Sequence, residues 1–463
     1  MAIDNWNVDT AALSAAAQAQ APRAIEDLRT LVSYPSLAFD GYDLQPGRDC
    51  AATVVGQLHE AGVANAATID IGGRLPLVWG TVPGPAGAPT VLLYSHYDIQ
   101  PAPVEEQGWE TDPYTMTQKA DGRWYGRGAA DDKSGVVGHI AALRALGLRA
   151  DGTAPLTIKI CFEGEEEWNS TLDSYIAPHA EMFTADAYLI ADGGGIVVGE
   201  PTIERAMRGT VAVTATLRTI KQALHSGLFG GAVPDAMVAF MLMMSSCYGE
   251  NGATTIPGLD GADYPGVDYP ADLLREQAGL LDGVEFAGIG NLPSRLWSRP
   301  SLSVIGLDGL PSIQDSSNII IPEVSARLSL RYQPGITARE ALDALEAHLE
   351  AHVPFGAQLE IAEIQAADPF SFEPSETFLA AANEAFEVAF GSPLQLKASG
   401  GSIPMLTELQ KVAPQADFLV YGAEDAQASK IHGGNESVDP GELKRIIVTE
   451  TLFLQKLARG TLK

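Results

Sequence analysis

The chain has 463 residues, of which 46% are hydrophobic, and its 59 acidic and 29 basic residues give a formal net charge of −30. This length suffices for two or more domains, and the charge argues against nucleic acid or anionic membranes as partners, because both repel an acidic surface. No run approaches the ~20 apolar residues of a membrane-spanning helix, and the first residues lack the basic start and apolar core of a signal peptide. The scattered cysteines Cys50, Cys161 and Cys247 form no CxxC pair, which favours reduced thiols and a cytoplasmic location.

Helical and strand-like segments alternate along the first part of the chain. Apolar residues at helical spacing predict helices at 23–33, 49–61 and 134–148. Apolar runs predict strands at 75–82, 90–98, 156–164 and 187–192. This alternation predicts an α/β sheet with helices on both faces.

The pattern changes after about Met207. The segment 210–219 alternates like a half-exposed antiparallel strand. Further strands are predicted at 302–310 and 324–334, and helices at 233–247 and 337–353. The α/β pattern resumes near Pro369 with helices at 375–389 and 440–459. We therefore expect an α+β domain at 207–368, inserted into a larger domain formed by 1–206 and 369–463.

One apolar run ends in a histidine and an aspartate that are two residues apart. His96 and Asp98 close the strand predicted at 90–98. Residues two apart in a strand point to the same side, so both side chains can face one site. A histidine is the commonest metal ligand, and a neighbouring carboxylate fixes its tautomer. The HxD pattern alone is common, so the metal interpretation depends on the rest of the chain.

Four further segments place carboxylates or a histidine where predicted elements end. Asp131 and Asp132 precede a helix, where capping is the plain alternative. The run 163–167 holds four carboxylates. One interpretation is an exposed acidic loop. The other is a cation site, because crowded carboxylates repel one another unless they share a divalent cation or one of them holds a proton. Asp192 ends a strand, as an ordinary turn residue also does. His432 lies between two loop-like stretches.

The remaining histidines indicate no chemistry. His348 and His352 are four apart on a predicted helix but lack the glutamate of HExxH, so they are interpreted as surface or packing residues. His59, His139 and His179 have no evident chemical partner. The strand ends together supply two histidines and three carboxylates, which suit zinc, manganese or cobalt. Two metal ions fit this set if one carboxylate bridges them.

At this point six segments resemble those of one family, in order and over nearly the whole chain. They are SHYDIQP (95–101), GRGAADDKS (126–134), EGEEEWNS (163–170), HSGLFGGAVPDA (225–236), GGSIP (400–404) and HGGNE (432–436). The family is that of the co-catalytic zinc metallopeptidases, which include carnosine dipeptidases, acetylornithine deacetylase, aminoacylase and glutamate carboxypeptidase. The resemblance implies a zinc-peptidase-like catalytic domain with a mixed sheet, plus an inserted α+β lid that dimerises.

The resemblance also implies roles for individual residues. His96 and Asp192 would bind one metal, Glu167 and His432 the other, and Asp131 would bridge the two. Asp98 would orient His96, and Glu166 would be the general base for a metal-activated water. His225 would act in the partner subunit of a homodimer and stabilise the oxyanion there. Substrate binding is expected from Arg331, which would grip the substrate carboxylate, and from Asn318, Gly401 and Ser402.

The expected substrate is a dipeptide or similar small peptide with a free carboxylate, because the aspartate at position 192 and the HSGLFGGAVP segment resemble the dipeptidase branch. One departure concerns the substrate amine. The related dipeptidases usually read REGGSIP, but Ser399 stands where their glutamate would hold a free amine. Either another acid such as Glu436 takes this role, or the substrate is N-acylated. An N-acyl-amino-acid amidohydrolase or a carboxypeptidase therefore stays open, as does an inactive metal-binding scaffold.

Overall fold

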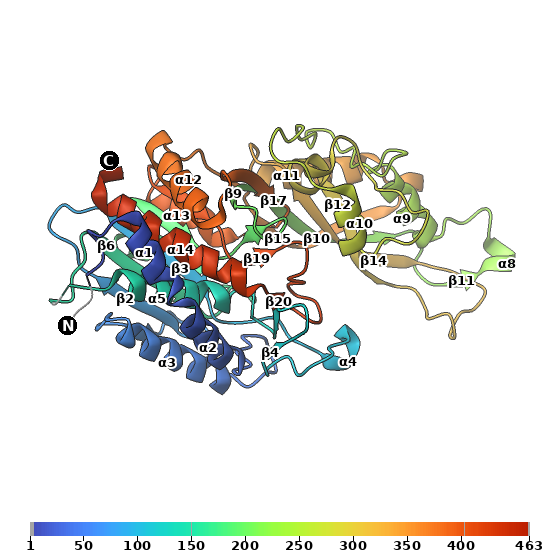
Figure 1. Cartoon of the computed structure of the whole chain (residues 1–463). Helices are drawn as coiled ribbons and strands as arrows, with labels where there is room; N and C mark the ends of the chain where they lie inside the picture. Colours follow the sequence, from blue (N-terminus) through green and yellow to red (C-terminus); the bar gives the residue numbers. More distant parts are fainter. Residues whose placement is uncertain (1–3, 150, 402, 462–463) are drawn as a thin grey trace.

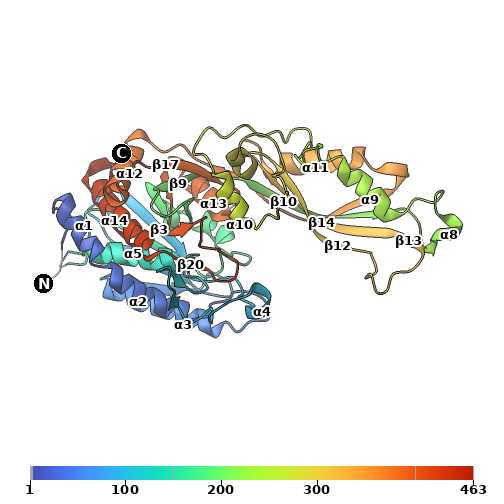
Figure 2. The ribbon, with the colours of Figure 1, turned by 45° about the vertical axis from the view of Figure 1, so that its right-hand side comes forward.

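The structure, a computed structural model, describes residues 4–149, 151–401 and 403–461 (Figure 1). The molecule is elongated: one part is built on a large mixed sheet, and a second part, residues 209–367, extends away from it. The turned view in Figure 2 shows the same separation. We call residues 209–367 the distal part.

The large sheet has the order β1-β2-β6-β3-β7-β18-β9-β16, with β17 beside β9. Its strands are β1 (Ala67–Ile69), β2 (Leu77–Val82), β3 (Thr90–His96), β6 (Thr157–Glu163), β7 (Ala187–Ile190), β9 (Thr202–Met207), β16 (Phe370–Ser371), β17 (Gln395–Ser399) and β18 (Asp417–Val420). The neighbours β6, β3, β7 and β18 are parallel. Their carboxyl ends therefore meet at one edge of the sheet, where ligands bind in open α/β folds.

Helices cover both faces of this sheet. One face carries α1 (Thr10–Gln18), α2 (Ala21–Val32), α3 (Gln45–Glu60), α5 (Lys133–Leu146), α12 (Glu376–Phe390) and α14 (Pro440–Lys456). The other carries α6 (Leu172–Ile176), α7 (Ala180–Phe183) and α13 (Pro404–Val412). The expected α/β fold with a mixed sheet between helices is confirmed.

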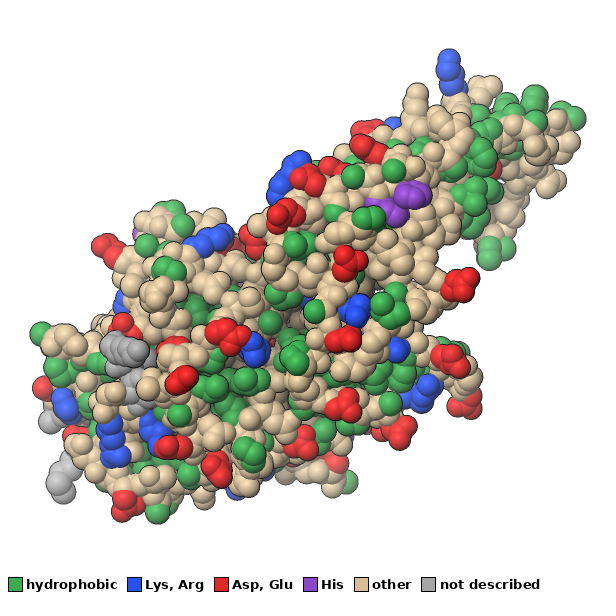
Figure 3. Space-filling view, turned by 90° about the horizontal axis from the view of Figure 1, so that it is seen from above, with side chains coloured by type: hydrophobic (Ala, Val, Ile, Leu, Met, Phe, Trp, Pro, Cys, Tyr) green, Lys and Arg blue, Asp and Glu red, His purple; other side chains and the backbone are tan. Residues whose placement is uncertain are grey.

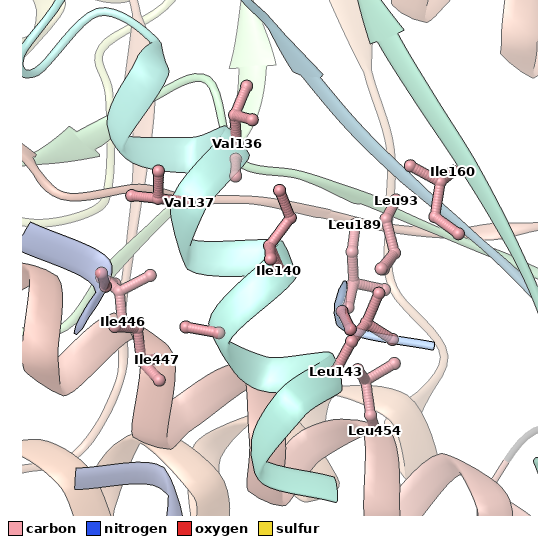
Figure 4. Packing of buried hydrophobic residues seen from close by; sticks show 14 of the residues in the cluster. Leu93, Val136, Val137, Ile140, Leu143, Ile160, Leu189, Ile446, Ile447 and Leu454 are labelled. Carbon is pink, nitrogen blue, oxygen red and sulfur yellow. The ribbon is translucent and has the colours of Figure 1, made fainter. Parts of the chain in front are cut away.

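Helix α5 lies at the centre of the larger core (Figure 4). All of its residues are buried, as expected for a helix that is apolar on nearly every side. Ile140 and Leu143 point toward Leu93 and Leu189 of the sheet, whereas Ile446 of α14 lies on another side of the helix. This packing fixes the start of α5 beside the strand ends.

The distal part contains an antiparallel sheet in the order β12-β14-β10-β15. Its strands are β10 (Gly209–Arg218), β12 (Ser301–Asp308), β14 (Glu323–Tyr332) and β15 (Gln358–Ala367). Helices α9 (Ala236–Ser245) and α11 (Ala338–Ala351) share one apolar core with this sheet. Strand β15 was not predicted, and α9 begins after 233 because the Asp235 side chain accepts from the amides of Met237 and Val238.

Short elements complete the description: α4 (Val104–Gln107), β4 (Thr117–Gln118), β5 (Trp124–Tyr125), β8 (Gly194–Gly195), β11 (Leu224–His225), α8 (Ser226–Phe229), α10 (Ala271–Gln277), β13 (Ile319–Ile320), β19 (Glu424–Asp425) and β20 (Ser437–Val438). Among the described residues, no helix is both long and apolar enough to cross a membrane. The domain boundaries 1–206, 207–368 and 369–463 stay a prediction.

Candidate active site

His96 ends β3 at the carboxyl edge of the large sheet, and its two ring nitrogens have different neighbours. Nε2 lies 3.0 Å from Asp131 Oδ1 and 3.9 Å from Asp192 Oδ1. Nδ1 lies 3.3 Å from Asp98 Oδ1 and 3.2 Å from the Asp98 carbonyl oxygen. With Nδ1 donating to Asp98, Nε2 is left as a lone-pair donor that faces the carboxylates, which is the arrangement of a metal ligand.

The neighbours Asp131 and Asp132 have separate tasks. Asp131 faces His96, whereas Asp132 turns back to the sheet, where its Oδ2 accepts from Ser95 Oγ at 2.5 Å and from the His96 amide at 3.1 Å. Asp132 occupies the N-cap position of α5, but its side chain accepts no hydrogen bond from the amides of that helix. The capping alternative is therefore wrong for this pair.

The four carboxylates at 163–167 are divided between the protein interior and the site. Glu163 accepts from Tyr94 Oη at 2.7 Å and from Ser170 Oγ at 2.5 Å. Glu165 accepts from the backbone amides of Arg74 and Leu75. Because Glu163 and Glu165 are buried, the alternative of an exposed acidic loop is wrong. Glu166 and Glu167 remain for the site.

Asp98 joins the two halves of this arrangement. Its Oδ1 accepts from the Glu166 amide at 3.2 Å, and its Oδ2 accepts from the Glu167 amide at 3.0 Å. Asp98 also contacts His96 and is fully buried. One carboxylate therefore fixes the position of His96 on β3 relative to the loop after β6 that carries Glu166 and Glu167.

His432 reaches the cluster from the other end of the chain. Its Nε2 lies 3.0 Å from Asp131 Oδ2 and 3.1 Å from Glu167 Oε2. Asp131 thus contacts His96 with one oxygen and His432 with the other. The predicted ligands His96, Asp131, Glu167, Asp192 and His432 are brought together, with Asp131 between the two histidines.

The electrostatics of the cluster are those of a cation site. Burial raises the pKa of Asp192 to about 7, against the opposing effect of His96. Burial, and then the charge of Asp192, raises the pKa of Glu166 well above its usual value. Burial lowers the pKa of His432, but hydrogen bonds to Asp131 and Glu167 outweigh it and raise that pKa to about 10.

Oxygen and imidazole groups of this kind fit divalent metal ions. Ligand atoms of Asp131, Glu167 and His432 all lie within 4.8 Å of one another, as do those of His96, Asp132 and Asp192. Asp132 is already bonded to Ser95 and to the backbone. Asp131 also forms a third group with Asp192 and Glu424, so the cluster offers more than one set of candidate ligands for a divalent cation around Asp131.

Glu436 has a structural task and is not available for a substrate amine. It is fully buried and accepts from Arg127 Nη1 at 2.6 Å and from the amides of Gly128, Ala130 and Asp131 at 2.9–3.1 Å. The alternative that Glu436 replaces the missing glutamate is wrong. The residue instead fixes the loop that carries Asp131.

The predicted substrate residues lie in different places. His225 and Asn318 are both exposed at the far end of the distal part, where the Ser226 amide donates to the Asn318 carbonyl at 2.9 Å (Figure 1). Arg331 lies near the other end of this part, on β14 opposite Thr210. Gly401 is exposed after β17, and Ser402 lies outside the described residues.

Two residues were missed in the sequence. Glu424 supplies a carboxylate oxygen within 4.8 Å of oxygens of Asp131 and Asp192, although no motif indicates it. His139, for which no partner was expected, is buried in α5 and bonds Glu450 Oε1 at 2.8 Å. Its partner is 311 positions away, so no local pattern could show it.

The buried His96, the exposed His432 and the carboxylates between them, gathered at the carboxyl edge of a mixed α/β sheet, are typical of a metal-dependent hydrolase. The chain belongs to peptidase family M20/M25/M40, whose model matches residues 92–456. It is therefore a metallopeptidase of that family.

Individual relatives agree with this family. The chain is 36% identical to a cysteinylglycine-S-conjugate dipeptidase of Corynebacterium striatum, over 93% of this chain and 95% of that protein. The fold is shared with the dipeptidase Dug1p of Saccharomyces cerevisiae (TM-score 0.81, 23% identity, 98% and 99% of the two chains). It is also shared with human carnosine dipeptidase 1 (TM-score 0.80, 22% identity, 99% and 100%).

Proposed function

We propose that this protein hydrolyses the amide bond of dipeptides, or of similar small peptides with a free carboxylate, with two divalent metal ions. The observation that carries the proposal is the different placement of two adjacent carboxylates. Glu167 lies 3.1 Å from His432 within a candidate ligand group, whereas Glu166 belongs to none of these groups yet faces their charges. A purely structural metal site has no need of such an additional base.

In the proposed reaction, His96 and Asp192 would hold one metal ion and Glu167 and His432 the other, with Asp131 available to both. When bound, the two ions, which we propose to be Zn²⁺ with Mn²⁺ or Co²⁺ as alternatives, would supply Lewis acidity at the carbonyl and activate water. Glu166 takes a proton from the attacking water and gives it to the leaving amine, a task suited to a carboxylate whose pKa is raised. Arg331 suits the substrate carboxylate because guanidinium can pair with both oxygens.

We further propose a homodimer in which His225 stabilises the oxyanion in the active site of the partner subunit. His225 lies on β11 at the far end of the distal part, away from the cluster of its own chain (Figures 1 and 2). Hydrophobic side chains gather at this end in the space-filling view (Figure 3). The exposed hydrophobic residues of the distal part include Met241 and Leu242 of α9 and Ile305 of the edge strand β12. An exposed apolar face beside an edge strand favours association.

A second candidate is supported by Ser399. Its side chain accepts from the Gly401 amide at 3.2 Å and brings no negative charge for a substrate ammonium. An N-acyl-amino-acid amidohydrolase or a carboxypeptidase would need no such charge. The inactive scaffold is disfavoured by Glu166. The cytoplasmic location and the absence of nucleic acid or membrane partners stay proposals from composition and charge.

Turnover of a free dipeptide and of its N-acetylated form, with metal analysis of the same sample, tests the proposal. We expect hydrolysis of the free dipeptide; cleavage of only the acetylated form would establish the second candidate. The variant Glu166→Ala should keep its metal ions and lose a factor of roughly 10²–10⁴ in kcat, the usual contribution of a general base. Unchanged turnover would show that Glu166 is not the base.

A further inference from the structure

His432 lies on a loop whose backbone adopts an uncommon conformation. The loop runs from Asp425, at the end of β19, to Ser437, at the start of β20. Within it, Lys430, His432 and Asn435 have φ angles of 51°, 60° and 61°, in the left-handed region that residues other than glycine rarely adopt. Such a conformation persists only where surrounding contacts hold it. The position of His432 therefore depends on the contacts that hold this loop.

One buried arginine closes the base of the loop. Arg123 directly precedes β5, and its Nη2 donates to Asp425 Oδ2 at 2.7 Å and to the Ser437 carbonyl at 2.9 Å. Its Nε donates to Ser437 Oγ at 2.8 Å, and Nη2 also donates to Ser429 Oγ at 3.3 Å. Because Asp425 and Ser437 stand at the two ends of the loop, a single guanidinium group joins these ends.

The partners of Arg123 also bind one another. Ser429 Oγ donates to Asp425 Oδ2 at 3.0 Å, and Asp425 Oδ1 accepts from the Ala428 amide at 2.7 Å. The Ser437 amide donates to the Ser429 carbonyl at 3.0 Å. These hydrogen bonds join groups of the chain itself and need no bound ion. None of the partners belongs to a candidate ligand group of the described residues, so the network lies behind the metal site and is not part of it.

The apex of the loop is much less enclosed than its base. The His432 side chain is 54% exposed, so packing alone does not fix it, and its place follows from the loop below. Among the described residues, His432 belongs to one candidate ligand group, with Asp131 and Glu167, whereas the two other groups do not include it. A displaced loop would therefore weaken one metal position and leave the ligands of another in place.

We propose that Arg123 is a positioning residue for His432 and determines how tightly the metal ion beside Asp131 and Glu167 is held, without contacting that ion. The planar guanidinium reaches acceptors at both ends of the loop, whereas a lysine ammonium is a single point of charge on a flexible stem. Loss of a group that orients a metal ligand weakens metal affinity about 10- to 100-fold. This inference rests on the proposed two-metal function.

The test compares Arg123→Lys with the wild type. The substitution keeps a positive charge beside Asp425 but does not join the two ends of the loop. The affinities of metal-free protein for Zn²⁺ are measured by competition with a chelator, which resolves the individual ions. We expect one Zn²⁺ to bind roughly 10- to 100-fold more weakly and the other to bind as in the wild type. At limiting Zn²⁺, kcat on a dipeptide should fall, excess Zn²⁺ should restore it, and KM should not change.

Two further variants complete the test. Ser437→Ala removes only the Oγ that accepts from Arg123 Nε, so it should cause a smaller loss of the same affinity, and it decides the question if Arg123→Lys does not fold. Arg339→Lys, at an exposed position of α11, is the matched control and should bind both ions like the wild type.

Two results would overturn the inference although the dipeptidase function stands. One is that Arg123→Lys and Ser437→Ala bind both Zn²⁺ ions with wild-type affinity. The other is that both affinities fall equally, which would give Arg123 a general structural role. If the wild type itself binds fewer than two Zn²⁺ ions or cleaves no dipeptide, the proposed function fails instead.

Discussion

Replacement of Asp98 tests whether one buried carboxylate organises the metal site. Asp98 contacts His96 Nδ1 at 3.3 Å and accepts from the amides of Glu166 and Glu167 at 3.2 and 3.0 Å. In Asp98→Asn, one of these oxygens becomes an NH2 group. If the NH2 group takes the place of Oδ2, it faces the N–H of Glu167, so that two donors meet and the hydrogen bond is lost. If it takes the place of Oδ1, it faces the N–H of Glu166 and the ring of His96, and those contacts are lost instead.

The expected loss follows from these contacts. A buried donor without an acceptor costs about 1–3 kcal/mol, and loss of the carboxylate behind a metal-binding histidine weakens metal affinity about 10- to 100-fold. Because Glu166 moves with the same loop, kcat should fall by a further factor of about 10². Metal affinity is measured by competition with a chelator, and kcat on a dipeptide.

Asp282→Asn is the control, since Asp282 is exposed in the distal part, and it should behave like the wild type. If Asp98→Asn binds metal and turns over substrate within twofold of the wild type, Asp98 does not organise the site. Loss of activity with unchanged metal affinity would restrict its role to the loop of Glu166.

Three further outcomes are expected. Mixing the inactive variants His225→Ala and Glu166→Ala should restore part of the activity, because a hybrid dimer contains one site with both residues; no recovery despite proven subunit exchange would refute action in trans. Chelation should lower the Tm, with recovery that depends on the concentration of added metal, because ions that bind only the folded state stabilise it by mass action; a Tm indifferent to metal would contradict the site. Burial, and then the charge of Glu408, raises the pKa of Asp173 to about 6, so ionised Asp173 costs stability as the pH rises from about 4 to about 6. Asp173→Asn should therefore raise the free energy of unfolding by about 1–3 kcal/mol at pH 7 and change it little at pH 4. Urea unfolding at both pH values measures this difference, and an equal increase at the two pH values would refute the reasoning.

The sequence predicted those features whose physical cause is local. Strand β3 and helix α5 follow from apolar runs and helical spacing, and the parallel order of β3, β6 and β7 brings their ends together. Strand β15 was missed because it is an edge strand whose residues are largely exposed, so it has no buried face to show in the sequence. Likewise, the residue types alone do not tell which of Asp131 and Asp132 faces the cluster; only the family resemblance assigned that place to Asp131.

Long-range contacts were the other limit of prediction. Glu424 reaches Asp192 because β19 pairs with β8, and nothing around either residue in the sequence specifies that pairing. His139 and Glu450 meet because α5 and α14 pack together in the core. Such partners become visible only when the fold places distant segments side by side.

The segment HGGNE illustrates how a short motif serves two purposes at once. His432 faces Asp131 and Glu167 within the cluster, whereas Glu436, four residues later, accepts from the amide of Asp131 itself. The ion pair of Glu436 with Arg127 is almost completely buried, and a buried pair contributes little stability on balance because desolvation opposes it. The pair instead fixes the geometry of the site. The same segment supplies His432 as a candidate ligand and, through Glu436, holds Asp131 in place, so that His432 and Asp131 cannot move independently.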